Sequence, residues 1–359
     1  MESNRSNYIP TLDGWRAVAI LLVLFGHGIF MTFRPYGWTL VGAHGVEVFF
    51  VLSGYLITGK LLEDASLTKF YTRRAFRILP VLFTYLVAVC TLGFGLHRIP
   101  LLRSEVLSSG FFIRNYFVYL SATETGVGGF TGHLWSLSIE EQFYLLWPLV
   151  LIWIGKGRTR RQLFAVFALF SFWTAVYTAV HVARFFHFFG WPWVPNLNYA
   201  GLAIGCALRI ALSEVGASAV LVRIFNGRST LFVAVLLAYI VLFHRRITMF
   251  DPLICSLGIC ATLVEPQGLA GRVLEWRVLR WVGRLSYSLY IWQQLFLGYG
   301  EHFRSFGRLC AFPMNFASLF IVSSASYYLL EKPLMRFGHR LTSELTRKPP
   351  LPALKPILT

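Results

Sequence analysis

The stretch "GWRAVAILLVLFGHG", from Gly14 to Gly28, reads as a membrane-spanning helix that keeps a charged residue near one end and an imidazole near the other. At about 100° per residue, His27 returns to nearly the same helix face as Arg16, about 16 Å further along the axis. A charge at the centre of a span costs at least about 2.5 kcal/mol and usually lines a cavity. Snorkelling of Arg16 and simple packing of His27 are the alternatives, but the pair on one face favours a polar passage.

The composition of the whole chain agrees with a membrane location. Of its 359 residues, 56% are hydrophobic and only 14% are charged, whereas a soluble domain has about a quarter charged residues. The net charge of +17 comes in short bursts between apolar segments, as the positive-inside rule expects, so no nucleic-acid partner is indicated. The five cysteines are odd in number and scattered; they predict neither a disulfide framework nor a metal site.

Hydropathy predicts an all-α integral membrane protein, a bundle of about ten transmembrane helices, since a span needs about 20 apolar residues. The candidate spans are approximately 14–33, 45–62, 79–96, 139–155, 162–180, 198–212, 229–243, 251–265, 284–300 and 313–331. Residues 97–132 fit an interfacial helix, a re-entrant segment or part of a catalytic mouth. A signal peptide at the first span is disfavoured, because no small-residue cleavage site follows closely.

The distribution of Lys and Arg predicts the orientation. With ten spans and an inside N-terminus, most of the 33 Lys and Arg residues fall on the inner side. We therefore expect both termini in the cytoplasm and the protein in the cell (inner) membrane, in contact with the lipid bilayer.

Six segments, in this order, resemble motifs of the acyltransferase-3 family of membrane O-acyltransferases. They are "LDGWRAVAILLVLFGH", "GVEVFFVLSGYLITGKLL", "FYTRRAFRILP", "HLWSLSIEEQFYLLWP", "RLSYSLYIW" and "EKPLMRFG". The resemblance implies a transmembrane domain over residues 1–335, followed by a cytoplasmic tail over 336–359. It also implies transfer of an acyl group, by our interpretation acetyl, from cytoplasmic acyl-CoA to an extracytoplasmic hydroxyl. Such acceptors are often glycans, glycolipids or sugar-bearing metabolites.

That activity explains the two residues of the opening stretch. Arg16 near the inner mouth can meet CoA phosphates, and His27 can remove a hydroxyl proton near neutral pH. Base catalysis is favoured over an acyl-histidine, although the residues alone allow both. Glu47, just inside the outer end of the second span, is predicted to hold the second imidazole nitrogen; an interfacial carboxylate is the alternative. Ser53 and Gly54 predict close helix packing.

Three arginines precede the third predicted span. Arg74 and Arg77 are neighbours on one helical face, and guanidinium groups match phosphate oxygens bidentately. The resemblance marks this Arg-x-x-Arg segment, with Arg73 beside it, as an acyl-CoA phosphate site; positive-inside anchoring is the alternative. Pro80 is expected near the start of the following helix.

The acceptor is predicted to bind where the chain enters the fourth span from outside. Flat aromatic faces bordered by hydrogen-bonding groups suit a sugar ring, which nominates His133, Trp135, Glu140, Glu141 and Gln142. Glu141 has a structural explanation as well, because Ser138-x-x-Glu141 is a capping-box pattern.

The segment "SYSLYIWQQLF" departs from the family. Many members have a histidine where this chain has Gln293, and a glutamine cannot titrate, which concentrates the proton chemistry on His27. Tyr287 and Tyr290 are expected to line the tunnel or to pack. Some family members carry a hydrolase-like domain after the last span; since this chain ends soon after Pro333, we expect the membrane domain or a partner to recognise the acceptor.

Two other classes of protein fit parts of the pattern. A small-molecule or ion transporter would also keep His, Arg and Glu within spans, but no repeat and no matched pair of broken helices is visible. A scaffold would not need His27 and Glu47 there.

Overall fold

The computed structural model describes residues 8–28, 41–117, 129–155, 162, 165, 199–243, 250–297 and 307–345, and every regular element within these ranges is a helix. This confirms the predicted all-α class. In chain order the helices are α1 (Pro10–His27), α3 (Val41–Glu63), α4 (Leu67–Cys90), η2 (Thr91–Gly95), α5 (Arg103–Gly110), α7 (Leu134–Gly155), α9 (Ala200–Ser213), α10 (Val215–Phe225), α11 (Ser229–Leu242), α12 (Asp251–Val264), α13 (Leu269–Leu274), α14 (Arg277–Trp292), η4 (Gln293–Leu295), η5 (Gly307–Cys310), α16 (Met314–Ser326), η6 (Tyr327–Glu331) and α17 (Lys332–Leu345).

Within the described ranges, three helices are long and apolar enough to cross a membrane. They are α3, α4 continued by η2, and α7; the pair α9 and α10, bent by 102°, would be a fourth. The other predicted spans coincide wholly or partly with shorter helices, except 162–180, which lies outside the described residues apart from positions 162 and 165. The total of about ten spans stays a prediction.

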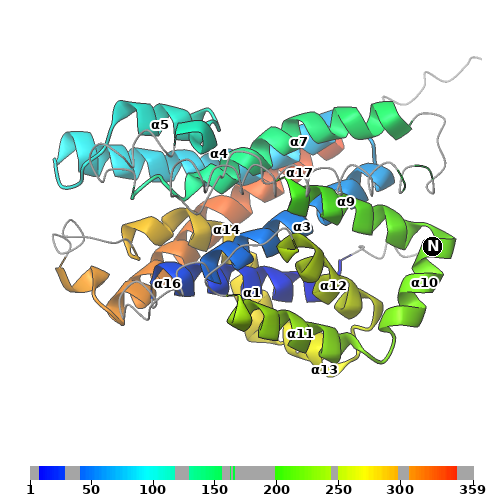
Figure 1. The fold of residues 1–359 in the computed structure, drawn as a ribbon. Coiled ribbons are helices and arrows are strands. Elements are labelled where there is room, and N and C mark those ends of the chain that lie inside the picture. Colours follow the sequence, from blue (N-terminus) through cyan, green and yellow to red (C-terminus); the bar gives the residue numbers. More distant parts are fainter. Residues whose placement is uncertain are drawn as a thin grey trace, which may run out of the picture.

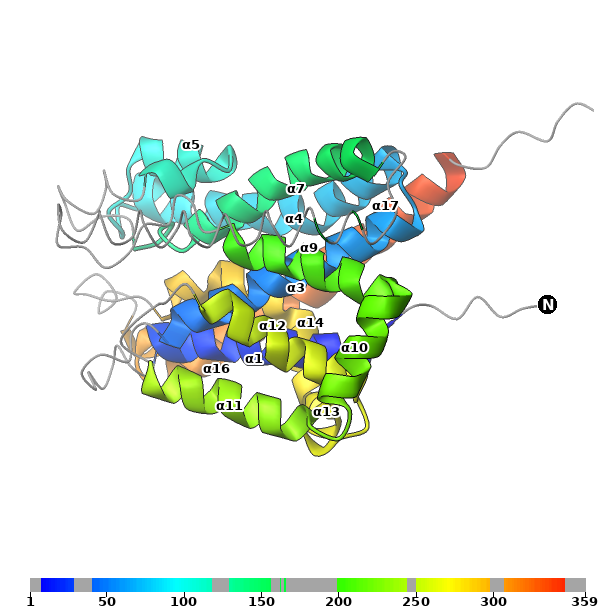
Figure 2. The ribbon, with the colours of Figure 1, turned by 45° about the vertical axis from the view of Figure 1, so that its right-hand side comes forward.

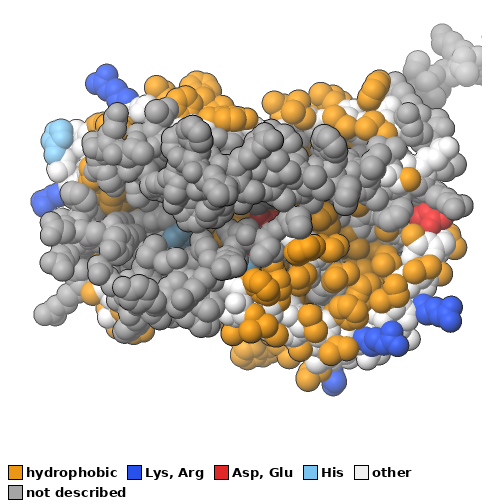
Figure 3. Space-filling view, in the orientation of Figure 1, with side chains coloured by type: hydrophobic (Ala, Val, Ile, Leu, Met, Phe, Trp, Pro, Cys, Tyr) orange, Lys and Arg blue, Asp and Glu red, His pale blue; other side chains and the backbone are white. Residues whose placement is uncertain are grey.

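The helices lie in layers that are visible in two orientations (Figures 1 and 2). Helices α4, α5, α7 and α17 form one side, α1, α3 and α14 lie in the middle, and α11 and α13 form the other side. Helix α12 packs against α11 and also against α3 and α9. In the middle layer, α1 packs against both α3 and α14, and α3 packs against α9. Apolar side chains are exposed along the lower right face in Figure 3, where α11 presents Leu231, Val235 and Val241; such a surface suits lipid.

The contact between α3 and α9 depends on two glycines. A Cβ atom on Gly54 would collide with the carbonyl of Leu202, and one on Gly205 would collide with the carbonyl of Val51. The two backbones therefore approach each other through hydrogen-only positions, as in other membrane helix pairs. The close packing predicted at Gly54 is confirmed. The same prediction for Ser53 stays a prediction; its hydroxyl donates a hydrogen bond to Glu140 of α7, and the residue lines the cavity described below.

Helix α4 carries the arginine segment and the following span as one continuous element. Its N-cap is Ser66, whose hydroxyl accepts a hydrogen bond of 3.4 Å from the backbone N–H of Lys69. Pro80 therefore lies inside the helix, and its predicted position near a helix start is wrong. A packed membrane helix tolerates the loss of the one backbone hydrogen bond that proline removes. The helix therefore continues through Pro80, and Arg74 and Arg77 lie one turn apart on it.

Residues 103–117 form a compact unit against α4 and α7. Arg114 pairs with Glu105 at 3.2 Å, and both side chains are 1% exposed. The backbone N–H of Arg114 also donates to the hydroxyl of Ser138 on α7. This segment is thus fastened to α7.

Candidate functional site

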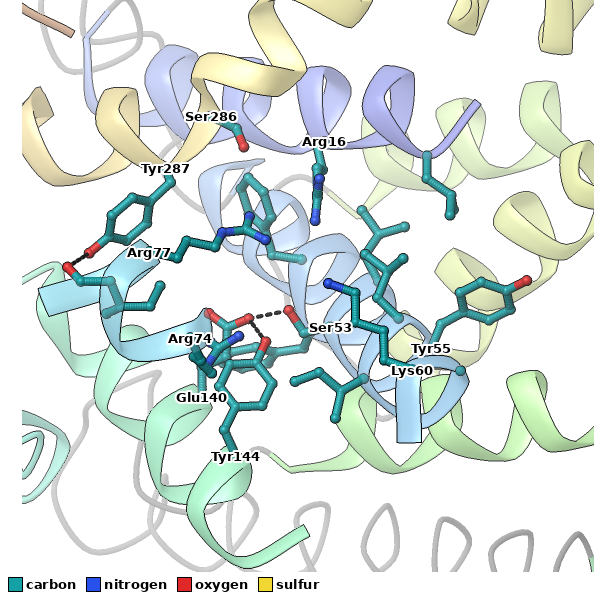
Figure 4. A pocket seen from close by; sticks show the side chains of 18 of the residues that line it. Arg16, Ser53, Tyr55, Lys60, Arg74, Arg77, Glu140, Tyr144, Ser286 and Tyr287 are labelled. Atoms are coloured by element: carbon teal, nitrogen blue, oxygen red, sulfur yellow. Dashed lines mark hydrogen bonds between the residues drawn. The ribbon is translucent and has the colours of Figure 1, made fainter. Parts of the chain in front are cut away.

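A cavity of about 760 Å³ lies between α1, α3, α4, α7, α9 and α14. Its lining includes five basic side chains, Arg16, Lys60, Arg74, Arg77 and Arg209, against three acidic ones, Asp13, Glu63 and Glu140. These basic residues come from α1, α3, α4 and α9; Figure 4 shows Arg16, Lys60, Arg74 and Arg77 around one space. The cavity therefore has a positive bias that no single segment creates.

Two of these arginines form ion pairs within the protein. Arg74 donates to Glu141 from both Nη2, at 2.6 Å, and Nε, at 3.1 Å, and its guanidinium lies over the ring of Tyr144. Arg209 pairs with Glu63 at 3.1 Å. Since their charges are compensated within the protein, they offer little to a ligand.

Arg77 and Lys60 make no ion pair with the side chains that the structure describes, and the Arg77 Nε is buried without a hydrogen-bond partner among them. Among the described side chains, Arg16 forms a single ion pair, with Asp13 at 3.4 Å. Figure 4 shows all three side chains pointing into the same space. Uncompensated guanidinium and ammonium groups that face one cavity bind phosphate-type anions well.

The polar groups of the cavity change character along α7. Ser136, Glu140 and Tyr144 all line it and are spaced four residues apart, so they form a column about 12 Å long on one helix face. Glu140 Oε1 accepts hydrogen bonds from the hydroxyls of Ser53 and Tyr144. The end of this column next to Ser136 carries hydroxyls instead of charges.

Two tyrosines of α14 complete the lining. Tyr287 donates to the carbonyl of Ile78 at 2.7 Å, which ties α14 to α4. The Tyr290 hydroxyl lies 2.8 Å from the Ser136 hydroxyl and donates to the His133 carbonyl. Both side chains thus line the cavity and are also fixed by hydrogen bonds to main-chain carbonyls.

His27 ends α1 beyond the cavity lining. Its Nδ1 lies 3.0 Å from the carbonyl of Val23, and because a carbonyl only accepts, Nδ1 carries the proton. In the neutral ring Nε2 is then left with a free lone pair. Gln293 neighbours the ring, although its amide makes no well-aligned hydrogen bond among the described residues; His133 is also close.

Glu47 and Arg73 lie elsewhere. Glu47 is buried on the face of α3 that contacts α9, where its Oε2 is 3.0 Å from the place of a Cβ on Gly201. Of the two imidazole nitrogens of His27, one of which Glu47 was predicted to hold, Nδ1 contacts the carbonyl of Val23. Arg73 donates to Thr342 of α17 at 2.9 Å and does not line the cavity.

The predicted acceptor residues separate into several groups. Glu140 faces the cavity, whereas Glu141 pairs with Arg74. The capping-box interpretation is wrong, because α7 begins at Leu134 and its second turn already contains Ser138.

The remaining members of the predicted acceptor patch make structural contacts. Gln142 donates to the Phe112 carbonyl at 2.7 Å, and Trp135 packs edge-on against Phe50. His133 is buried, and its Nε2 lies 3.1 Å from the Ile291 carbonyl. These three side chains support the wall between α7 and its neighbours.

The comparison with known proteins identifies the family. Residues 9–330 match the family model described as an acyltransferase domain. The chain belongs to the acyltransferase-3 family. This confirms the resemblance carried by the six motifs. No solved structure matches this acyltransferase-3 chain.

Curated members of the acyltransferase-3 family are similar over most of this chain. It is 30% identical to the putative peptidoglycan O-acetyltransferase YrhL of Bacillus subtilis, over 94% of this chain and 57% of that protein. It is 26% identical to the peptidoglycan O-acetyltransferase OatA of Listeria monocytogenes, over 92% and 56% respectively. The chain therefore spans a little over half the length of these relatives.

Sequence reasoning missed two of the side chains that shape this acyltransferase-3 cavity. Lys60 ends the motif "VEVFFVLSGYLITGK" and resembles an ordinary anchoring lysine, and Ser53 resembles a packing residue. A helical count would have found them: Ser53 and Lys60 are seven residues apart, which returns to nearly the same face. That face carries Val46 and Phe49 as well.

Proposed function

We propose that this chain is a membrane O-acyltransferase that uses acyl-CoA, with acetyl-CoA as the favoured donor. Membership of the acyltransferase-3 family supports acyl transfer, and the names of its relatives support O-acetylation. The observation that carries the choice of donor is the set of uncompensated cations, Arg77 and Lys60 with Arg16 beside them, in one cavity. A CoA thioester supplies several phosphate charges that match them.

The arrangement along α1 supports delivery of the acyl group from this cavity to His27. Arg16 and His27 lie on one face of the same continuous helix, about 16 Å apart along its axis. Phosphates held at Arg16, Lys60 and Arg77 would leave an extended arm pointing toward the far end of α1. The thioester would then approach the imidazole from the cavity side.

His27 acts as the general base. Its Nε2 lone pair takes the proton from the acceptor hydroxyl, whose oxygen attacks the thioester carbonyl carbon. When the carbon–sulfur bond breaks, the thiolate leaves and receives that proton from the imidazolium. The products are the ester and free CoA, and no other reactant is required. A role for Glu47 beside this ring stays a prediction.

The acceptor is a hydroxyl of an extracytoplasmic carbohydrate, either a glycan, a glycolipid or a sugar-bearing metabolite. Relatives named peptidoglycan O-acetyltransferases favour a glycan. The bursts of Lys and Arg support cytoplasmic termini and a cavity mouth on the cytoplasmic side of the cell membrane. His27, at the other end of α1, would meet the acceptor from outside.

Calorimetric titration of acetyl-CoA into the purified, detergent-solubilised chain tests the donor site. We expect saturable binding that Arg77→Ala weakens at least tenfold, the effect of losing a charge-assisted phosphate contact. Arg73→Ala is the matched control, since that neighbouring arginine contacts Thr342 and not the cavity.

Two outcomes would contradict the proposal. Absence of binding in a folded sample would exclude acyl-CoA as donor and favour the transporter alternative, which uptake into proteoliposomes then tests. Equal losses in the Arg73 and Arg77 variants would mean that the cavity cations do not hold the phosphates.

A further inference from the structure

Glu140 is one of three acidic side chains in the cavity lining. Asp13 and Glu63 pair with arginines, whereas Glu140 makes no ion pair among the described residues. Both of its hydrogen bonds, from Ser53 and Tyr144, end on Oε1. Oε2 accepts no hydrogen bond from a described side chain, although Glu140 lines a cavity that contains five basic residues. A carboxylate that forms no ion pair with the described side chains and keeps one oxygen open can accept a hydrogen bond from a neutral donor group.

The position of Glu140 along the cavity specifies which part of a ligand it meets. On α7 it lies one turn from Tyr144, over whose ring the Arg74 guanidinium sits, and one turn from Ser136, which contacts Tyr290. On α3 its partner Ser53 lies seven residues from Lys60, about 10 Å along the helix. Glu140 thus lies between the Arg74–Tyr144 contact and the hydroxyls of Ser136 and Tyr290. Arg77 enters the same space from the side of Tyr287 (Figure 4).

A phosphate cannot be the group that forms a hydrogen bond with the Glu140 carboxylate. Two like charges at hydrogen-bond distance repel each other, and neither side offers a proton. An amide N–H or a hydroxyl does offer one, and a hydrogen bond to a carboxylate is about twice as strong as one between neutral groups. The arm of acyl-CoA, which links the phosphates to the thioester, contains two amides and a hydroxyl.

We infer that Glu140 is a specificity-determining residue that accepts a hydrogen bond from the amide-bearing arm of the donor through its open Oε2, with Ser53 and Tyr144 fixing the carboxylate by its other oxygen. This inference rests on the proposed function, because it assumes an acyl-CoA donor. It assigns the cations and Glu140 to different parts of the same molecule. The cations hold the charged end, and Glu140 recognises the neutral arm.

Two probes separate these parts: acetyl-CoA, which has the arm, and adenosine 3′,5′-bisphosphate, which has phosphates but no arm. Titration calorimetry measures both ligands on the wild-type chain and on Glu140→Ala, Glu140→Gln and Arg77→Ala. We expect Glu140→Ala to weaken acetyl-CoA binding about tenfold or more. The affinity for the bisphosphate should stay within about twofold of the wild-type value. Glu140→Gln, which keeps an acceptor oxygen, recovers part of the loss. Arg77→Ala should weaken the binding of both ligands.

Each other outcome has a definite meaning. The inference is wrong if Glu140→Ala weakens the binding of both probes equally, or strengthens the binding of both by removing a negative charge. In either case Glu140 makes no specific contact with the amide-bearing arm. If wild-type binding of acetyl-CoA is intact and the Glu140 variants bind like wild type, the inference fails while the proposed function stands. If the wild-type chain binds neither probe, the proposed function itself fails. A Glu140→Gln sample that elutes as a single folded species guards against misfolding of the alanine variant.

Discussion

The two arginines of the Arg-x-x-Arg segment lie one turn apart on α4, and the structure predicts opposite consequences for their removal. Arg74 forms two hydrogen bonds with Glu141 and covers Tyr144. Arg77 faces the cavity without an ion pair among the described side chains. Arg74→Ala should therefore destabilise the fold, whereas Arg77→Ala should weaken donor binding and leave the fold almost unchanged.

The size of the stability effect follows from the burial of the pair. Breaking a buried ion pair by removing one partner costs about 3 to 5 kcal/mol, because the other charge is left uncompensated. The side chains of Arg74 and Glu141 are each 15% exposed and border a cavity that admits water, so we expect the lower end, about 3 kcal/mol. Arg77→Ala loses no such partner and should change stability by less than about 1 kcal/mol.

Equilibrium unfolding of both variants in mixed micelles, followed by tryptophan fluorescence, measures this difference. The double variant Arg74→Met/Glu141→Gln removes both charges and should regain about 2 kcal/mol relative to Arg74→Ala, since paired charges can be replaced by neutral groups at little cost. The reasoning is refuted if Arg77→Ala is as destabilising as Arg74→Ala, or if the double variant is no more stable than the single one.

Three further predictions follow from the described contacts. His27→Ala should abolish acyl transfer while acetyl-CoA affinity stays within a few-fold, because His27 lies outside the cavity lining; near-normal turnover would exclude it as the base. Gly54→Ala should sharply reduce folded yield by driving a Cβ into the Leu202 carbonyl, whereas Gly129→Ala, with nothing within 4 Å of the new atom, should not; equal yields on size-exclusion chromatography would contradict the close contact. Burial and the nearby charges of Arg73 and Lys60 lower the pKa of His339 below its usual 6.5, so the unfolded chain protonates first and stability should fall as the pH drops below about 6.5. His339→Gln should flatten that dependence in unfolding curves at pH 7.5 and 5.5, and unchanged slopes would refute it.

The sequence by itself determined relationships within single helices. A period of 3.6 residues places Arg16 and His27 on one face, and α1 is continuous between them. Composition and apolar length likewise indicate an all-α membrane protein, because lipid leaves backbone groups no partner except one another. The six motifs were specific enough to identify the family.

Only the tertiary structure decided which charges are compensated. Arg74 and Arg77 are indistinguishable in "FYTRRAFRILP"; the difference arises because Glu141 of α7 lies opposite Arg74. Likewise, Glu47 and Ser53 stand on α3 in one motif, yet rotation of α3 against α9 directs Glu47 away from the cavity and Ser53 toward Glu140. Periodicity fixes neighbours along one helix, but partners on another helix depend on how the backbones cross, here at Gly54 and its counterpart on α9.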